Sequence, residues 1–170
     1  VVVQSQNNSY LSSNYRGSAS PGGSVYMVDK VDLRIPPENI ILRASDSTQG
    51  KGFHGLWQFR DGGAAFAGSH AFASLTTLYE EEKYVLFAVV VADTSKEKNG
   101  YFHFADKLKF KTDDDMMAFV NEAKSRSLYP FSVDVLPSDR LMTLATVSNS
   151  ADGQCIVLVY RMLRSGEAGQ

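Results

Sequence analysis

Apolar residues occur mostly in short runs separated by polar or glycine-rich turns, a pattern typical of a protein built mainly from β-strands. The runs have the length of strands and are rich in β-branched and aromatic residues. Glycine, serine and proline in these separating segments favour loops. The predicted strands are residues 1–4, 24–28, 39–42, 84–92, 101–110, 131–135, 141–147 and 155–163.

Helical periodicity is clearest near residues 113–127. Thr112 is a suitable N-cap, three aspartates follow it at the positive end of the helix dipole, and apolar residues recur on one face. A short helical turn is predicted at residues 10–11 and a second helix at 71–79. Residues 47–68 contain six glycines, too many for a long regular element, and are interpreted as an insertion anchored by its aromatic side chains.

Length and composition indicate a single globular domain spanning residues 1–170. The chain is 44% hydrophobic and 21% charged, which suits one sizeable core. Its net charge of −2 and scattered basic residues argue against a nucleic-acid partner. No apolar run approaches the roughly 20 residues that span a bilayer. Membrane attachment is therefore expected only through an anchor or helix upstream of Val1.

Metal and cofactor chemistry find little support in the sequence. Cys155 is the only cysteine, so neither an internal disulfide nor a zinc site with several cysteines is possible. The acidic runs at 80–82 and 113–115 lack the alternating oxygen ligands of a calcium loop, and no second histidine lies at ligand spacing from His103. We expect no metal and no cofactor.

Several segments resemble the catalytic domain of class B sortases, the cell-wall transpeptidases of Gram-positive bacteria. Residues 143–147 are similar to the Thr-Leu-x-Thr-Cys strand end of that family, and the helix at 113–127 resembles its characteristic insertion. Residues 2–4, 22–27 and 72–75 add weaker similarities in the same order. The resemblance implies a mainly β fold, a closed barrel of about eight strands with a few appended helices. It also implies a location on the extracellular face of the membrane or in the cell wall.

The resemblance places the catalytic residues of the family on side chains that lack the required chemistry. In such enzymes a cysteine attacks a peptide carbonyl, an arginine stabilises the oxyanion, and a histidine transfers protons. These positions fall on Val147, Gln154 and, if residues 39–42 precede the Tyr-Gly-His of the family, Ala44. Valine cannot form an acyl-enzyme, glutamine lacks the charged fork of arginine, and alanine does not titrate. Three substitutions of this kind indicate a naturally degenerate site.

The leading hypothesis is a sortase-like pseudoenzyme of the Gram-positive surface. It would hold a sorting-signal-like peptide or a cell-wall surface protein, without cleaving it, in a groove near Thr146, Val147, Ser148 and Gln154. A purely structural surface domain with a collapsed groove is another possibility.

A divergent hydrolase or transpeptidase is the alternative from a different class. His54 or His70, together with Ser148 or Ser150, would then replace the lost groups, or Cys155 would act as a displaced nucleophile. Strand alternation argues against the cysteine, which is expected to point opposite to its neighbour on the strand and away from the groove.

Overall fold

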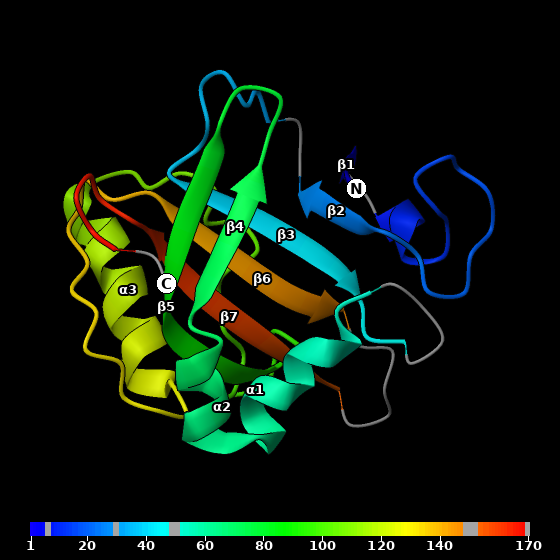
Figure 1. Cartoon of the computed structure of the whole chain (residues 1–170). Helices are drawn as coiled ribbons and strands as arrows, with labels where there is room; N and C mark the ends of the chain where they lie inside the picture. Colours follow the sequence, from blue (N-terminus) through cyan, green and yellow to red (C-terminus); the bar gives the residue numbers. More distant parts are fainter. Residues whose placement is uncertain (6–7, 29–30, 48–51, 148–152, 169–170) are drawn as a thin grey trace.

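The computed structural model describes residues 1–5, 8–28, 31–47, 52–147 and 153–168. Its centre is one curled sheet of seven strands in the order β1-β2-β3-β6-β7-β5-β4 (Figure 1). The strands are β1 (Val2–Ser5), β2 (Val25–Val28), β3 (Asn39–Ser45), β4 (Phe72–Thr76), β5 (Glu81–Asp93), β6 (Leu141–Val147) and β7 (Gln154–Met162). The helical elements are the 3₁₀ turns η1 (Asn8–Leu11) and η2 (His54–Trp57) and the helices α1 (Gln58–Asp61), α2 (Gly63–Ser69) and α3 (Asp113–Arg126).

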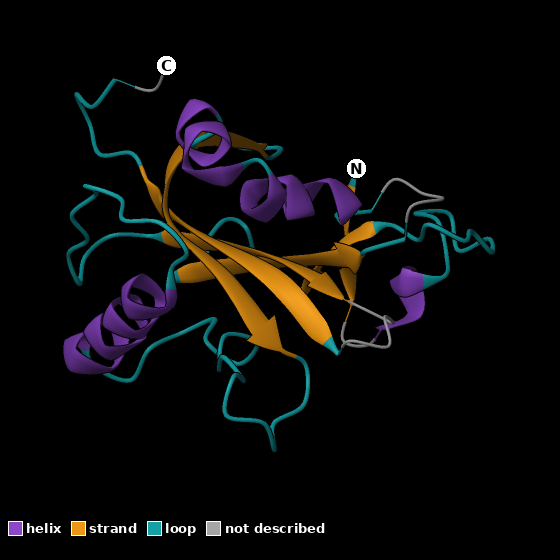
Figure 2. Cartoon of the chain, turned by 90° about the horizontal axis from the view of Figure 1, so that it is seen from below, coloured by secondary structure: helices purple, strands orange, loops and turns teal. Residues whose placement is uncertain are grey.

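The sheet is covered on both faces. Helix α3 packs on one face, and α1 and α2 pack on the other (Figure 2). Two hydrophobic clusters result, with alternate residues of β5, β6 and β7 contributing to one or the other. Strands buried on both faces are expected to be apolar along their whole length, which explains the continuous apolar runs of the sequence. Within the described residues, no helix is long and apolar enough to cross a membrane.

Strands β3 and β6 are parallel neighbours over seven consecutive residue pairs, from Asn39 with Leu141 to Ser45 with Val147. A polar contact inside the sheet accompanies this pairing. The Thr143 hydroxyl donates to the Asn39 side-chain oxygen at 3.0 Å, and both residues are fully buried. The Asn39 amide nitrogen donates in turn to the Lys107 carbonyl at 3.0 Å. Satisfied polar groups at such depth fix one register, because any shift would leave them without partners.

The strongest periodic signals of the sequence are confirmed. Helix α3 begins after Thr112, whose hydroxyl accepts a hydrogen bond from the Asp115 amide at 3.2 Å. Strands β3, β5, β6 and β7 lie at the predicted runs, with ends shifted by up to three residues. The short turn predicted at residues 10–11 is the end of η1.

The helix predicted at residues 71–79 is wrong, because residues 72–76 form strand β4. Exposure alternates along this strand, with Ala73 and Leu75 packed inward, and its residues pair antiparallel with β5. The apolar residues that suggested a helix are mostly not the buried ones, since Phe72, Leu78 and Tyr79 are exposed. Pairing with the long neighbouring strand favoured the extended form.

The described part of the predicted insertion at 47–68 is largely helical. Its glycines separate short helices and do not prevent them. Gly63 has φ +72°, and a Cβ at Gly62 would lie 2.7 Å from the Phe66 Cβ, so side chains are disfavoured at the break between α1 and α2. The predicted aromatic anchoring is confirmed, since Phe59 is buried in the cluster beneath these helices.

Two further predicted strands, at residues 101–110 and 131–135, are also wrong. Phe102 and Phe104 are both buried on the α3 side, as in a strand, but this segment makes only one isolated bridge, from Tyr101. Residues 131–135 are extended without strand pairing. The described residues therefore form a curled half-barrel of seven strands with β1 and β4 at the edges, and closure into a full barrel is not confirmed.

The buried contact between β3 and β6 makes a testable contribution to stability. Thr143→Val should lower the free energy of unfolding by about 1–3 kcal/mol, because the Asn39 oxygen loses its donor inside the sheet. Urea unfolding followed by circular dichroism measures the change. Thr76→Val, at an exposed position of β4, is the matched control and should change stability by less than about 0.5 kcal/mol. Equal stability of the two variants would contradict the role given to this contact.

Candidate functional site

The ends of β3, β6 and β7 bring three positions into one row across the sheet. Ser45 is the register partner of Val147. On the other side of β6, Ala145 pairs with Val157 in the antiparallel ladder, and the same register extended by two residues brings Val147 opposite Cys155. Side chains in register on adjacent strands share a face. The row therefore lies on the α3 side of the sheet, where Cys155 packs.

A hollow of about 360 Å³ opens beside this row, and we call it the Arg43 pocket. Val147 and Cys155 both line it, as does the predicted groove residue Thr146, whose hydroxyl accepts from the Ile156 amide at 3.0 Å. Tyr101, Phe104 and other residues that follow β5 also contribute to its lining. The full lining is Arg43, Asp93, Thr94, Lys96, Tyr101, Phe104, Ala105, Asp106, Thr146, Val147 and Cys155.

The predicted orientation of Cys155 is wrong. Cys155 and Gln154 do face opposite sides, as alternation requires, but it is Cys155 that shares the pocket with Val147. Gln154 is exposed and lines a different hollow. Ala44 is fully buried, pairs with Thr146, and lines neither hollow. The structure thus does not bring Ala44, Val147 and Gln154 together.

The Cys155 thiol is held in its neutral form. The residue is only 4% exposed, and this burial raises the pKa of the thiol to about 11. The Arg43 guanidinium lowers that pKa and the Asp93 carboxylate raises it, so the two charges oppose each other. With such a pKa, on the order of one thiol in ten thousand is ionised at pH 7. Thiolate is the nucleophilic form, so the pocket holds an unactivated cysteine.

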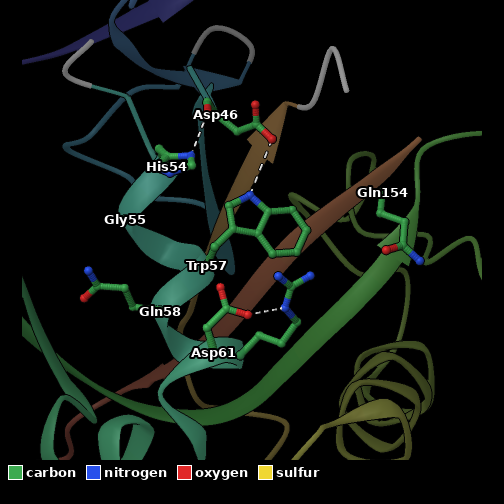
Figure 3. A pocket seen from close by; sticks show the side chains of 8 residues that line it. Asp46, His54, Gly55, Trp57, Gln58, Asp61 and Gln154 are labelled. Atoms are coloured by element: carbon green, nitrogen blue, oxygen red, sulfur yellow. Dashed lines mark hydrogen bonds and ion pairs between the residues drawn. The ribbon is translucent and has the colours of Figure 1, made fainter. Parts of the chain in front are cut away.

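A second hollow, of about 320 Å³, lies at the same end of the sheet on the side of η2 and α1 (Figure 3), and we call it the His54 pocket. The His54 Nδ1 atom lies 2.9 Å from the Asp46 carbonyl oxygen, and the Trp57 indole donates to the Asp46 carboxylate at 3.4 Å. The Arg60 guanidinium stacks over the Trp57 ring, 4.5 Å from its centre. Gln154 reaches this pocket from β7.

No histidine among the described residues lines the pocket that contains the thiol. His54 is in the pocket on the opposite face, and His70 stacks on Phe66 with ring centres 4.0 Å apart. The Ser69 hydroxyl lies 3.0 Å from the His70 Nδ1, a local contact of neighbours outside both pockets. His103 is exposed and packs against Tyr101. Ser148 and Ser150 are outside the described residues, among which no cluster suited to a metal ion occurs.

Comparisons with known proteins identify the architecture. No model of a protein family matches the chain, and no curated protein matches it. Among solved structures, a Staphylococcus aureus sortase B in complex with substrate superposes with a TM-score of 0.81 and 23% identity over 97% of this chain and 74% of that one. The chain has the fold of a class B sortase.

Two further structures of this fold give similar values. A Bacillus anthracis protein similar to sortase B has a TM-score of 0.80 and 25% identity, over 95% of this chain and 70% of its own. A mutant form of Clostridium perfringens sortase B has a TM-score of 0.82 and 22% identity, over 96% and 74%. The prediction of a mainly β, sortase-like fold is confirmed.

Sequence reasoning missed Arg43 in this sortase-like domain. The residue stands directly after a buried apolar run and looked like the end of the strand. In the structure β3 continues to Ser45, so Arg43 lies within it and shares a face with Ile41 and Ser45. The available signal was the alternation itself, which puts residues 41, 43 and 45 on one side once the strand is extended.

The opposing charges of Arg43 and Asp93 are expected to control the ionisation of Cys155. Arg43→Gln should raise the pKa of the thiol, because the positive charge that stabilises thiolate is lost, and Asp93→Asn should lower it. The rate of alkylation by iodoacetamide at mildly alkaline pH, followed by mass spectrometry, should therefore fall in the first variant and rise in the second. Since the chain has one cysteine, all of the signal comes from Cys155. Changes of the same sign in both variants would rule out this electrostatic account.

Proposed function

We propose that the chain is a sortase-like pseudoenzyme of the Gram-positive cell surface that binds a peptide at the ends of β3, β6 and β7 without cleaving it. The Arg43 pocket is the site of binding in this proposal. It takes up a sorting-signal-like peptide or a segment of a cell-wall surface protein, on the extracellular face of the membrane or in the cell wall. Staphylococcus aureus sortase B has been captured with a substrate, and a sortase B has been crystallised with triglycine, which supports a peptide as the ligand class.

The proposal rests on the row of residues at the strand ends, where no activated nucleophile is present. Val147 offers no nucleophile, and the thiol beside it belongs to Cys155, which is buried and protonated. No histidine among the described residues lines the Arg43 pocket. A thiol without a base within hydrogen-bond reach and without a depressed pKa is poorly suited to covalent catalysis. The pocket beside these residues nevertheless has a volume of about 360 Å³, which suits the binding of a ligand.

We further propose that the histidine and arginine positions of the family correspond to Ser45 and Cys155, and not to Ala44 and Gln154. Groups that act on one carbonyl have to face one pocket. Ser45 and Cys155 lie in the row with Val147, whereas Ala44 faces the core and Gln154 the other hollow. The order Tyr-Gly-His laid on residues 43–45 also ends on Ser45. The reassigned positions still contain neither histidine nor arginine.

An array of short immobilised peptides, followed by mass spectrometry of the bound peptide and of the protein, tests this function. The domain should retain peptides at their full mass and should gain no covalent adduct. Val147→Trp should weaken binding about tenfold or more, because an indole fills much of a hollow of this size. Val147→Ala, which enlarges the hollow, is the matched control and should bind. Both variants should give the far-ultraviolet circular dichroism of the unchanged protein.

A divergent thiol hydrolase or transpeptidase is the second candidate, and one observation favours it. Cys155 and Arg43 line the same pocket, so a thiol and a guanidinium are both present there, on strands other than those of the family pattern. In the array experiment this candidate requires cleaved peptide or an acyl adduct that disappears in Cys155→Ala. Such an adduct would overturn the pseudoenzyme proposal.

A further inference from the structure

Arg43 differs from most arginines of the chain in having no carboxylate partner among the described residues. Six of the eight arginines form an ion pair with an aspartate or glutamate: Arg34, Arg60, Arg126, Arg140, Arg161 and Arg164. Arg16 lies beside the Tyr15 ring at an exposed position. Arg43 is partly buried in the sheet, and its Nε atom is inaccessible to solvent and without a hydrogen-bond partner.

The surroundings of Arg43 do not neutralise it. Its register partner on β6 is Ala145, which is fully buried and offers only a methyl group. The Asp93 carboxylate lines the same pocket, but it lies 3.7 Å from the Lys98 amine and forms no ion pair with Arg43. Lys96 and Asp106 are exposed residues of the pocket lining and carry opposite charges. The Arg43 pocket therefore contains one partly buried cation with unused donors.

We propose that the Arg43 pocket recognises a carboxylate on its peptide ligand, with the Arg43 guanidinium as the main partner. A charged donor that is buried without an acceptor lowers stability, and an incoming carboxylate would supply an acceptor to the guanidinium. Guanidinium and carboxylate match in geometry and form two parallel hydrogen bonds. The proposal rests on peptide binding in this pocket and adds the chemical group that is read there.

The carboxylate has two possible sources in a peptide, the C-terminus and an acidic side chain. The C-terminal carboxylate is tested by comparing N-acetyl-triglycine with its C-terminal amide. The acidic side chain is tested by comparing N-acetyl-Gly-Asp-Gly-amide with its asparagine analogue. Binding to isotope-labelled protein is followed by two-dimensional NMR, with protection of Cys155 from alkylation as a local readout in the pocket. At least one acid should bind about tenfold or more tightly than its uncharged analogue.

Arg43→Gln should remove the preference for the acid, while Arg43→Lys should keep part of it, because lysine retains the charge but not the fork. Arg34→Gln is the matched control, since Arg34 is exposed, forms an ion pair with Asp32 and lies outside the pocket. It should bind like the unchanged protein. Thermal unfolding of each variant verifies that the fold is retained.

The outcomes separate this inference from the function on which it rests. If no peptide of any kind perturbs the pocket, the proposed peptide binding itself fails. If acid and amide bind equally, or if Arg43→Gln keeps the preference for the acid, peptide binding stands and the role of Arg43 is overturned. Tighter binding of the amides would also overturn it, and would indicate that Asp93 or Asp106 dominates recognition.

Discussion

Strands β3 and β6 run parallel over seven residues, and the strand-end site exists only because their register is fixed. The Asn39–Thr143 hydrogen bond lies inside the sheet, where an amide or hydroxyl without a partner is costly. A slip by one residue would break this contact and turn every side chain of one strand to the other face. Arg43 and Val147 would then face different pockets. The chemistry at one end of these strands thus follows from a polar contact near their other end.

The same sheet end divides the polar groups between two pockets. Cys155 and Arg43 face the α3 side, whereas His54 and Gln154 face the side of η2 and α1. A nucleophile and its base have to lie within about 2.6–3.2 Å of each other to act together, and packed strands separate these two sets. The chain contains both a cysteine and a histidine at this end of the sheet, but the sheet holds Cys155 and His54 in different pockets. The residue types alone would suggest a cysteine–histidine catalytic pair, which this geometry does not allow.

Sequence reasoning found the elements whose pattern has a single interpretation. Helix α3, with Thr112 as its cap, and the buried strands β5 and β6 belong to this group. It failed where an apolar spacing typical of a helix falls largely on exposed residues, as around residues 72–76, and where aromatic side chains are buried without strand pairing, as in residues 101–110. In both cases the deciding factor is the neighbouring element, which no local pattern records.

The sequence indicated only part of the candidate site, because the neighbouring strands decide which residues lie together. The strand end at Val147, with Thr146 before it, follows from local motif similarity, and both residues line the Arg43 pocket. The partners on β3 and β7 depend on which residue of each strand faces the same side, and an error of one residue moves the inferred group across the sheet. Ala44 in place of Ser45, and Gln154 in place of Cys155, are errors of this kind if the groups of the family share one pocket. Arg43 escaped notice because the strand was predicted to end before it.

Arg43 is the residue for which folding alone gives no adequate reason. A charged side chain beside a buried alanine, with a donor that finds no acceptor, lowers stability, and aliphatic replacements at such positions are often neutral or stabilising. If the pocket had no ligand, an aliphatic residue at position 43 would extend the core represented by Ile41. Side chains that lower stability are most common where they contact something outside the fold. The unpaired guanidinium is therefore better explained by a ligand than by the packing of the sheet, and this argument is independent of whether any bond is broken in the pocket.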